Sequence, residues 1–142
     1  MKQLNWAVLG TGVIANEMAQ ALQKQGKSLY SVGNRTYEKA VAFGEQYGIS
    51  KVYTEFQQIF TDPEVDAIYI TTPHNTHREF MEMAIENGKH ILVEKSITLN
   101  SKELDEMIHL ADKKGVVIAE AMTISISLIN AIRMIRPTKT VP

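Results

Sequence analysis

The sequence predicts an α/β protein in which helices cover both faces of a doubly wound parallel sheet. Three observations favour this class. Short apolar runs alternate with segments of helical period, a glycine-rich segment follows the first run, and the 142 residues are 44% hydrophobic and 22% charged, as in an average globular domain. A chain of this length buries about 70% of the surface exposed on unfolding, so it needs no disulfides. We expect residues 1–122 to form one domain.

Six apolar runs are the expected strands, because each is short and bounded by turn residues. Right-handed crossovers would make these strands parallel and would bring their carboxyl ends to one edge of the sheet, where ligands bind in such folds. The expected strands are Leu4–Leu9, Ser28–Val32, Val52–Tyr53, Ala67–Ile70, His90–Val93 and Val116–Ala119.

Apolar residues at helical spacing predict surface helices between these strands. One stripe runs from Ile14 to Leu22, and a second runs from Ala40 to Tyr47, where Gly48 suits the left-handed position after a helix. Each stripe provides one apolar face that can cover the sheet.

Two more helices are expected to begin at capping boxes, in which an N-cap side chain and a glutamate three residues later bond reciprocally to the backbone. The pairs are Thr76 with Glu79 and Asn100 with Glu103. Each pair precedes a further apolar stripe, so both helices should also pack on the sheet.

Charge and residue counts exclude several classes of function. Fifteen Lys and Arg against sixteen Asp and Glu leave a formal charge of -1, without the basic footprint of a nucleic-acid or membrane-surface binder. The chain has no Cys, and its four His have no familiar metal-ligand spacing. It also lacks an apolar run of about 18 residues and a cleavable leader. We therefore expect a cytoplasmic protein with a small-molecule partner, no metal, no nucleic acid and no membrane.

The glycine loop, residues 10–15, reads Gly-Thr-Gly-Val-Ile-Ala and joins the first expected strand to the first expected helix. Gly10 permits the tight turn, Gly12 lets the backbone approach a pyrophosphate, and Ala15 takes the third small position. The N-terminus of the helix then offers N–H groups to phosphates. This context predicts a dinucleotide-binding loop, and an ordinary glycine-rich turn is the alternative.

The end of the second expected strand indicates which dinucleotide binds. NAD sites usually place Asp or Glu about 20 residues after the loop, on the ribose 2′-OH. Here Asn34 and Arg35 occupy that region, and the nearest acid is Glu38. A guanidinium can pair with a 2′-phosphate, so NADP(H) is favoured over NAD(H). Two alternatives stay open: Arg35 is a solvated loop residue, or the domain binds a ligand other than a nicotinamide cofactor, such as S-adenosylmethionine.

Two further segments follow the fourth and fifth expected strands. Residues 71–77 read Thr-Thr-Pro-His-Asn-Thr-His, and Glu94 and Lys95 precede Ser96. Lys95 would lie where a nicotinamide ring reaches the sheet edge, so its ammonium can serve a reacting carbonyl or alcohol oxygen as acid or base. An exposed ion pair with Glu94 is the alternative.

Together, the glycine loop, the loop over residues 71–77, the Val-Glu-Lys segment and the run Ala119–Met122 resemble the glucose-fructose oxidoreductase, inositol dehydrogenase and MocA (Gfo/Idh/MocA) family. The resemblance implies a Rossmann domain that holds a nicotinamide cofactor for hydride transfer at a carbonyl or alcohol carbon of a sugar, polyol or related small molecule. It implies that Lys95 is catalytic and that Glu94 contacts the nicotinamide ribose. The residues that it places along the cofactor are Gly10, Thr11, Gly12, Val13, Ile14, Asn34, Arg35, Thr71, Thr72, Pro73, Asn75, His77, Glu94 and Lys95.

The sequence departs from the family pattern in two places. Ser96 stands where the family usually has Pro, and the family's second α/β substrate domain has no counterpart. All sixteen acidic residues lie at or before Glu120, so residues 123–142 are expected to be an atypical tail that is truncated or frame-shifted. An amphipathic terminal helix is the alternative for this tail. The alternative function is a catalytically silent dinucleotide-binding fragment that lacks the substrate domain. The sequence is compatible with a homo-oligomer.

Overall fold

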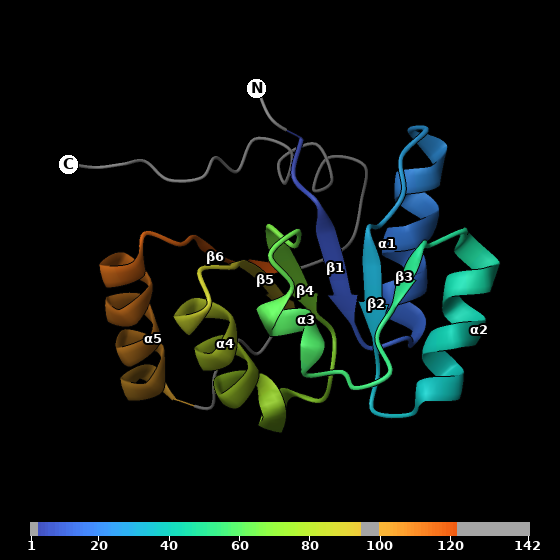
Figure 1. Cartoon of the computed structure of the whole chain (residues 1–142). Coiled ribbons are helices and arrows are strands. Elements are labelled where there is room, and N and C mark those ends of the chain that lie inside the picture. The colour runs from blue at the N-terminus through green and yellow to red at the C-terminus, as the bar shows by residue number, and fades with distance from the viewer. Residues whose placement is uncertain (1–2, 95–99, 122–142) are drawn as a thin grey trace.

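A six-stranded parallel sheet organises the part of the protein that the structure describes, in the strand order β3-β2-β1-β4-β5-β6 (Figure 1). The computed structural model describes residues 3–94 and 100–121. It confirms the expected doubly wound α/β class. The elements are β1 (Trp6–Leu9), α1 (Val13–Lys24), β2 (Ser31–Gly33), α2 (Tyr37–Tyr47), β3 (Lys51–Val52), α3 (Gln58–Thr61), β4 (Ala67–Ile70), a 3₁₀ turn η1 (His74–Thr76), α4 (His77–Glu86), β5 (His90–Glu94), α5 (Ser101–Lys114) and β6 (Ile118–Ala121).

Helices cover the sheet on both faces, with α1 and α2 on one side and α4 and α5 on the other (Figure 1). Successive strand side chains point to opposite faces, so each strand serves both layers. In β1, Val8 packs in the core under α1 and α2, whereas Ala7 and Leu9 pack in the core under α3, α4 and α5. This two-sided burial explains why the strands read as continuous apolar runs.

Several expected strand ends need correction. Strand β1 begins at Trp6 rather than Leu4, and β3 covers Lys51–Val52 rather than Val52–Tyr53. Strand β2 begins at Ser31 rather than Ser28, because Leu29 still belongs to the irregular segment after α1 and buries its side chain in the core under α1 and α2. Strand β6 begins at Ile118 rather than Val116. There the backbone N–H of Val117 donates to His90 Nδ1 at 3.1 Å, and the pairing of β5 with β6 starts at Ile118.

The two expected capping boxes have different outcomes. Asn100 caps α5 as expected, since its Oδ1 accepts a bond of 2.9 Å from the backbone N–H of Glu103. Thr76 does not cap α4, because its backbone is already right-handed helical and its Oγ1 donates to the Pro73 carbonyl at 2.6 Å. This hydroxyl closes the η1 turn instead.

The strand order reverses at β1, which pairs with β2 on one side and with β4 on the other. The connections from the two halves of the sheet leave in opposite directions there, so their loops separate above the carboxyl ends of β1 and β4. Such a reversal is where ligands bind in open α/β sheets. The fold therefore places the glycine loop beside the loop that follows β4.

Candidate functional site

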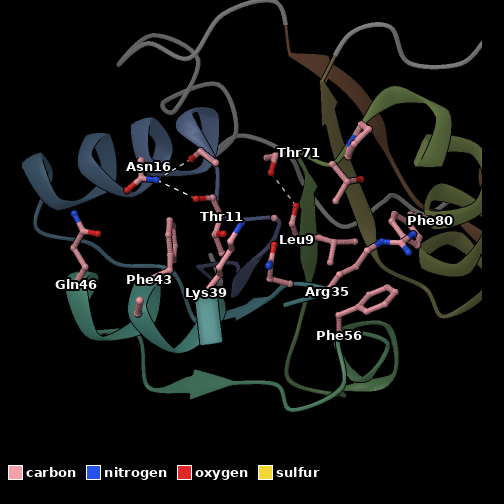
Figure 2. Close-up of a pocket in the computed structure, with 16 residues that line it drawn as sticks. Leu9, Thr11, Asn16, Arg35, Lys39, Phe43, Gln46, Phe56, Thr71 and Phe80 are labelled. Atoms are coloured by element: carbon pink, nitrogen blue, oxygen red, sulfur yellow. Dashed lines mark hydrogen bonds between the residues drawn. The ribbon is translucent and has the colours of Figure 1, made fainter. Parts of the chain in front are cut away.

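A cleft of about 540 Å³ opens at this strand reversal, and we call it the edge cleft (Figure 2). It brings together the ends of β1, β2 and β4 with parts of α1, α2 and α4. Its lining residues are Leu9, Gly10, Thr11, Gly12, Asn16, Asn34, Arg35, Lys39, Ala42, Phe43, Gln46, Phe56, Thr71, Thr72, Pro73 and Phe80.

Gly10 is required by the geometry at the end of β1. Its φ of +110° is a conformation that side-chain-bearing residues rarely adopt, and a Cβ there would lie 2.3 Å from Thr71 Oγ1. The backbone N–H of Gly10 donates to the Gly33 carbonyl at 2.9 Å, and Thr71 Oγ1 donates to the Leu9 carbonyl at 2.9 Å. These contacts join the ends of three strands beneath the cleft.

Gly12 differs from Gly10, because a Cβ added to it would meet no heavy atom within 4 Å. It is the N-cap of α1, and the first helical bond runs from the N–H of Asn16 to its carbonyl at 3.0 Å. The N–H groups of Val13, Ile14 and Ala15 therefore have no acceptor inside the helix. An open backbone and a positive helix end suit a diphosphate group.

Arg35 lies against two aromatic rings at the wall of the edge cleft. Its guanidinium carbon is 5.5 Å from the centroid of the Phe56 ring and 5.7 Å from that of the Phe80 ring. Figure 2 shows Arg35 extended toward both rings (Figure 2). Stacking of this kind restricts a guanidinium to a defined position. Lys39, one helical turn later on α2, adds a second cation to the cleft.

The loop after β4 forms the facing wall with Thr71, Thr72 and Pro73. Behind it, His77 is buried at the start of α4, and its Nε2 lies 2.9 Å from the Thr72 carbonyl. His77 therefore supports the loop and does not line the cleft. Asn75 is exposed in η1 and also lies outside the lining residues.

Glu94 ends β5 and accepts a hydrogen bond from the hydroxyl of Tyr69 in β4. Burial raises the pKa of Tyr69 above its ordinary value, and the Glu94 carboxylate raises it further. Glu94 and the exposed Val13 do not line the edge cleft, and neither does Ile14. Lys95, Ser96 and the tail over 123–142 lie outside the described residues.

The family described as oxidoreductases with an NAD-binding Rossmann fold matches residues 4–122 of this chain. The chain belongs to the Gfo/Idh/MocA family. The expected family is therefore confirmed, and the described domain is its NAD(P)-binding Rossmann domain. The glycine loop, the open Gly12 and the α1 N-terminus fit the diphosphate of such a cofactor.

Curated members of the Gfo/Idh/MocA family resemble the chain over this domain. It is 34% identical over 119 residues to trans-1,2-dihydrobenzene-1,2-diol dehydrogenase of Xenopus laevis, covering 82% of the chain and 36% of that protein. It is 32% identical over 120 residues to a scyllo-inositol 2-dehydrogenase (NADP(+)) of Bacillus subtilis, covering 84% and 37%. The chain thus spans little more than a third of the length of these relatives.

A solved structure of similar fold is that of KijD10, a 3-ketoreductase from Actinomadura kijaniata in complex with NADP. Its TM-score with this chain is 0.77 at 25% sequence identity, covering 84% of this chain and 37% of that one. None of the described helices has the length and apolarity needed to cross a bilayer. Within residues 3–94 and 100–121, His, Asp and Glu side chains form no group of three that could hold a metal ion.

The structure brings eight of the sequence-predicted Gfo/Idh/MocA cofactor residues into the edge cleft. It also adds residues that the sequence analysis missed, among them Asn16, Lys39, Phe56 and Phe80. Lys39 could have been found from its position, because it lies in the first turn of α2, four residues after Arg35. Phe56 carries no such signal, since only the tertiary fold brings it to Arg35. The eight predicted residues that line the cleft are Gly10, Thr11, Gly12, Asn34, Arg35, Thr71, Thr72 and Pro73.

Proposed function

We propose that this chain binds NADP(H) in preference to NAD(H), as the nucleotide-binding part of an oxidoreductase. The observation that carries the preference is the charge of the edge cleft. Among its described lining residues, Arg35 and Lys39 are charged and none is a carboxylate. The nearest acid in sequence, Glu38, is exposed on α2 and does not line the cleft.

This charge distribution favours a 2′-phosphate over a 2′-hydroxyl. A phosphate adds negative charge and acceptor oxygens, which a guanidinium can bind through two N–H groups. In NAD sites the ribose 2′-hydroxyl is usually bound by an Asp or Glu carboxylate, and none of these lining residues carries one. The rings of Phe56 and Phe80 hold the Arg35 guanidinium at the cleft wall, which reduces the entropy lost on binding.

The reaction class follows from the family. When bound, the nicotinamide cofactor supplies hydride exchange at its C4 carbon. We assign Lys95 the role of the acid or base that moves a proton at the substrate oxygen, and Glu94 a contact with the nicotinamide ribose. The relatives named for a cyclic diol and for an inositol favour a sugar, polyol or related small molecule as substrate.

Binding of each dinucleotide to the full 142-residue chain tests the cofactor preference. Titration with NADPH and with NADH, followed by nucleotide fluorescence, should give a lower Kd for NADPH. Arg35→Ala should weaken NADPH binding by roughly ten- to a hundredfold, because it removes a charged hydrogen bond, and should leave NADH binding unchanged. Equal loss for both nucleotides, or tighter binding of NADH by the unaltered chain, would contradict the proposed role of Arg35.

Arg78→Ala is the matched control, because it removes an arginine from the same domain outside the edge cleft. Arg78 pairs with Glu106 across α4 and α5 at 3.0 Å, and its removal should leave both dissociation constants unchanged. Turnover with a panel of sugars and polyols then separates an enzyme from a silent binding fragment. Nucleotide binding without hydride transfer on any of them would favour the silent fragment.

A further inference from the structure

We propose that Asn16 is a positioning residue, which sets the direction of the glycine-loop N–H groups and is itself oriented by Tyr47. The inference rests on the proposed binding of a dinucleotide in the edge cleft. It assigns a function to a side chain of α1 and to one of α2, neither of which the sequence analysis connected with the cofactor.

The Asn16 carboxamide bonds to the glycine loop from the side of α1. Its Nδ2 donates to the Gly12 carbonyl at 2.8 Å and to the Thr11 carbonyl at 3.2 Å. Figure 2 shows both bonds crossing from α1 to the loop at the cleft wall (Figure 2). A single side chain therefore fixes two consecutive carbonyl groups.

Tyr47 determines which way the Asn16 carboxamide points. The Tyr47 hydroxyl accepts hydrogen bonds from Gln20 Nε2 at 3.2 Å and from Gln46 Nε2 at 3.3 Å. These two donors occupy the lone pairs of the hydroxyl oxygen, so its own proton is directed to Asn16 Oδ1. With Oδ1 held toward α2, the amino group of Asn16 must face the loop carbonyls.

Fixing these carbonyls also fixes the N–H groups that follow them. In a planar trans peptide the C=O and the next N–H point in opposite directions. Carbonyls of Thr11 and Gly12 held toward Asn16 therefore turn the N–H groups of Gly12 and Val13 away from it, to the other side of the loop. These N–H groups are then aligned before a diphosphate arrives, which lowers the entropic cost of binding it.

Three variants test this arrangement: Asn16→Ala, Tyr47→Phe and the double substitution. Asn16→Ala should weaken NADPH, NADH and ADP-ribose alike by roughly tenfold, because all three carry the diphosphate. Tyr47→Phe should weaken them by about threefold, since the carboxamide keeps its donors but loses its orientation. In the Asn16→Ala background, Tyr47→Phe should have no further effect on any Kd.

Gln23→Ala is the matched control, because it removes an exposed side-chain amide from the same helix, far from the loop. It should leave all three dissociation constants unchanged. A purely structural role for Asn16 would lower the melting temperature without changing Kd below it, and would overturn the proposal. So would independent effects of the two substitutions in the double variant. An unaltered chain that binds none of the three nucleotides would instead refute dinucleotide binding itself.

Discussion

Replacement of Gly10 by alanine is expected to lower the free energy of unfolding by roughly 2–4 kcal/mol and to weaken NADPH and NADH binding about a hundredfold. The backbone at this position has a φ of +110°, and the added Cβ would lie 2.3 Å from Thr71 Oγ1. Relief of this overlap must move Thr71, which bonds to the Leu9 carbonyl and lines the cleft. Chemical denaturation and fluorescence titration of the full chain measure the two effects.

Gly12→Ala is the comparison that separates folding from binding. Its Cβ meets no heavy atom within 4 Å and its φ of -82° is ordinary, so the variant should lose about 1 kcal/mol or less, the usual preference of an N-cap for glycine over alanine. Nucleotide binding should nevertheless weaken at least tenfold, because the methyl group occupies the face that a diphosphate approaches. Unchanged affinity in Gly12→Ala would contradict the placement of the diphosphate, and unchanged stability in Gly10→Ala would contradict the strain argument.

The second large effect is expected at Asp62, which does not line the edge cleft. Its carboxylate is buried where α3 ends, and it accepts bonds from the Tyr53 hydroxyl at 2.7 Å and from the Glu64 N–H at 2.9 Å. Lys51 Nζ lies 3.3 Å from the same carboxylate, and the buried ammonium of Lys89 donates to the Asp62 carbonyl at 2.6 Å. Asp62→Asn should lower the free energy of unfolding near pH 7 by roughly 2–3 kcal/mol, since hydrogen bonds to a charged acceptor are lost.

The pH dependence of this loss identifies its cause. Burial alone would raise the Asp62 pKa, but the Glu64 N–H, the Tyr53 hydroxyl and Lys51 hold it below its ordinary value of 3.8. The unfolded chain therefore takes up the proton first as the pH falls, so this stabilisation is present above the ordinary pKa and is lost below it. The difference between the unaltered chain and Asp62→Asn should accordingly shrink below about pH 4.

Asp105→Asn provides the control for charge removal, because Asp105 is exposed on α5. It should change the free energy of unfolding by no more than about 0.5 kcal/mol. Urea denaturation of all three proteins at several pH values gives the comparison. A loss in Asp62→Asn that stays constant down to the lowest pH would show that the lost contacts do not depend on the carboxylate charge.

Local sequence features predicted the fold class and much of the cleft. Parallel strands buried on both faces must be apolar throughout, so the runs that became β1, β4 and β5 were visible without a structure. The glycine loop was equally visible, because the positive φ at Gly10 is a backbone conformation that few other residues can adopt. These features depend on neighbours in the chain, which a single sequence displays.

The rest depends on contacts between distant segments. Thr76 had the spacing of a cap, yet the preceding Pro73 carbonyl was the better partner for its hydroxyl. Phe56 reached Arg35 only through the crossing of the chain between the two halves of the sheet. In the sequence Asn16 is an ordinary polar residue of a helix. Its role depends on the hydrogen bond from Tyr47, which lies 31 residues later in the chain. No periodicity or spacing reports such pairs.

The edge strand β3 has a consequence for how the protein behaves in concentrated solution. It consists of Lys51 and Val52 alone, so it presents few free backbone groups to which a foreign strand could add. The Lys51 side chain is 48% exposed. If another chain docked there, the Lys51 ammonium would lose hydration, which is energetically unfavourable. The β3 edge of the sheet is therefore a poor template for fibril growth.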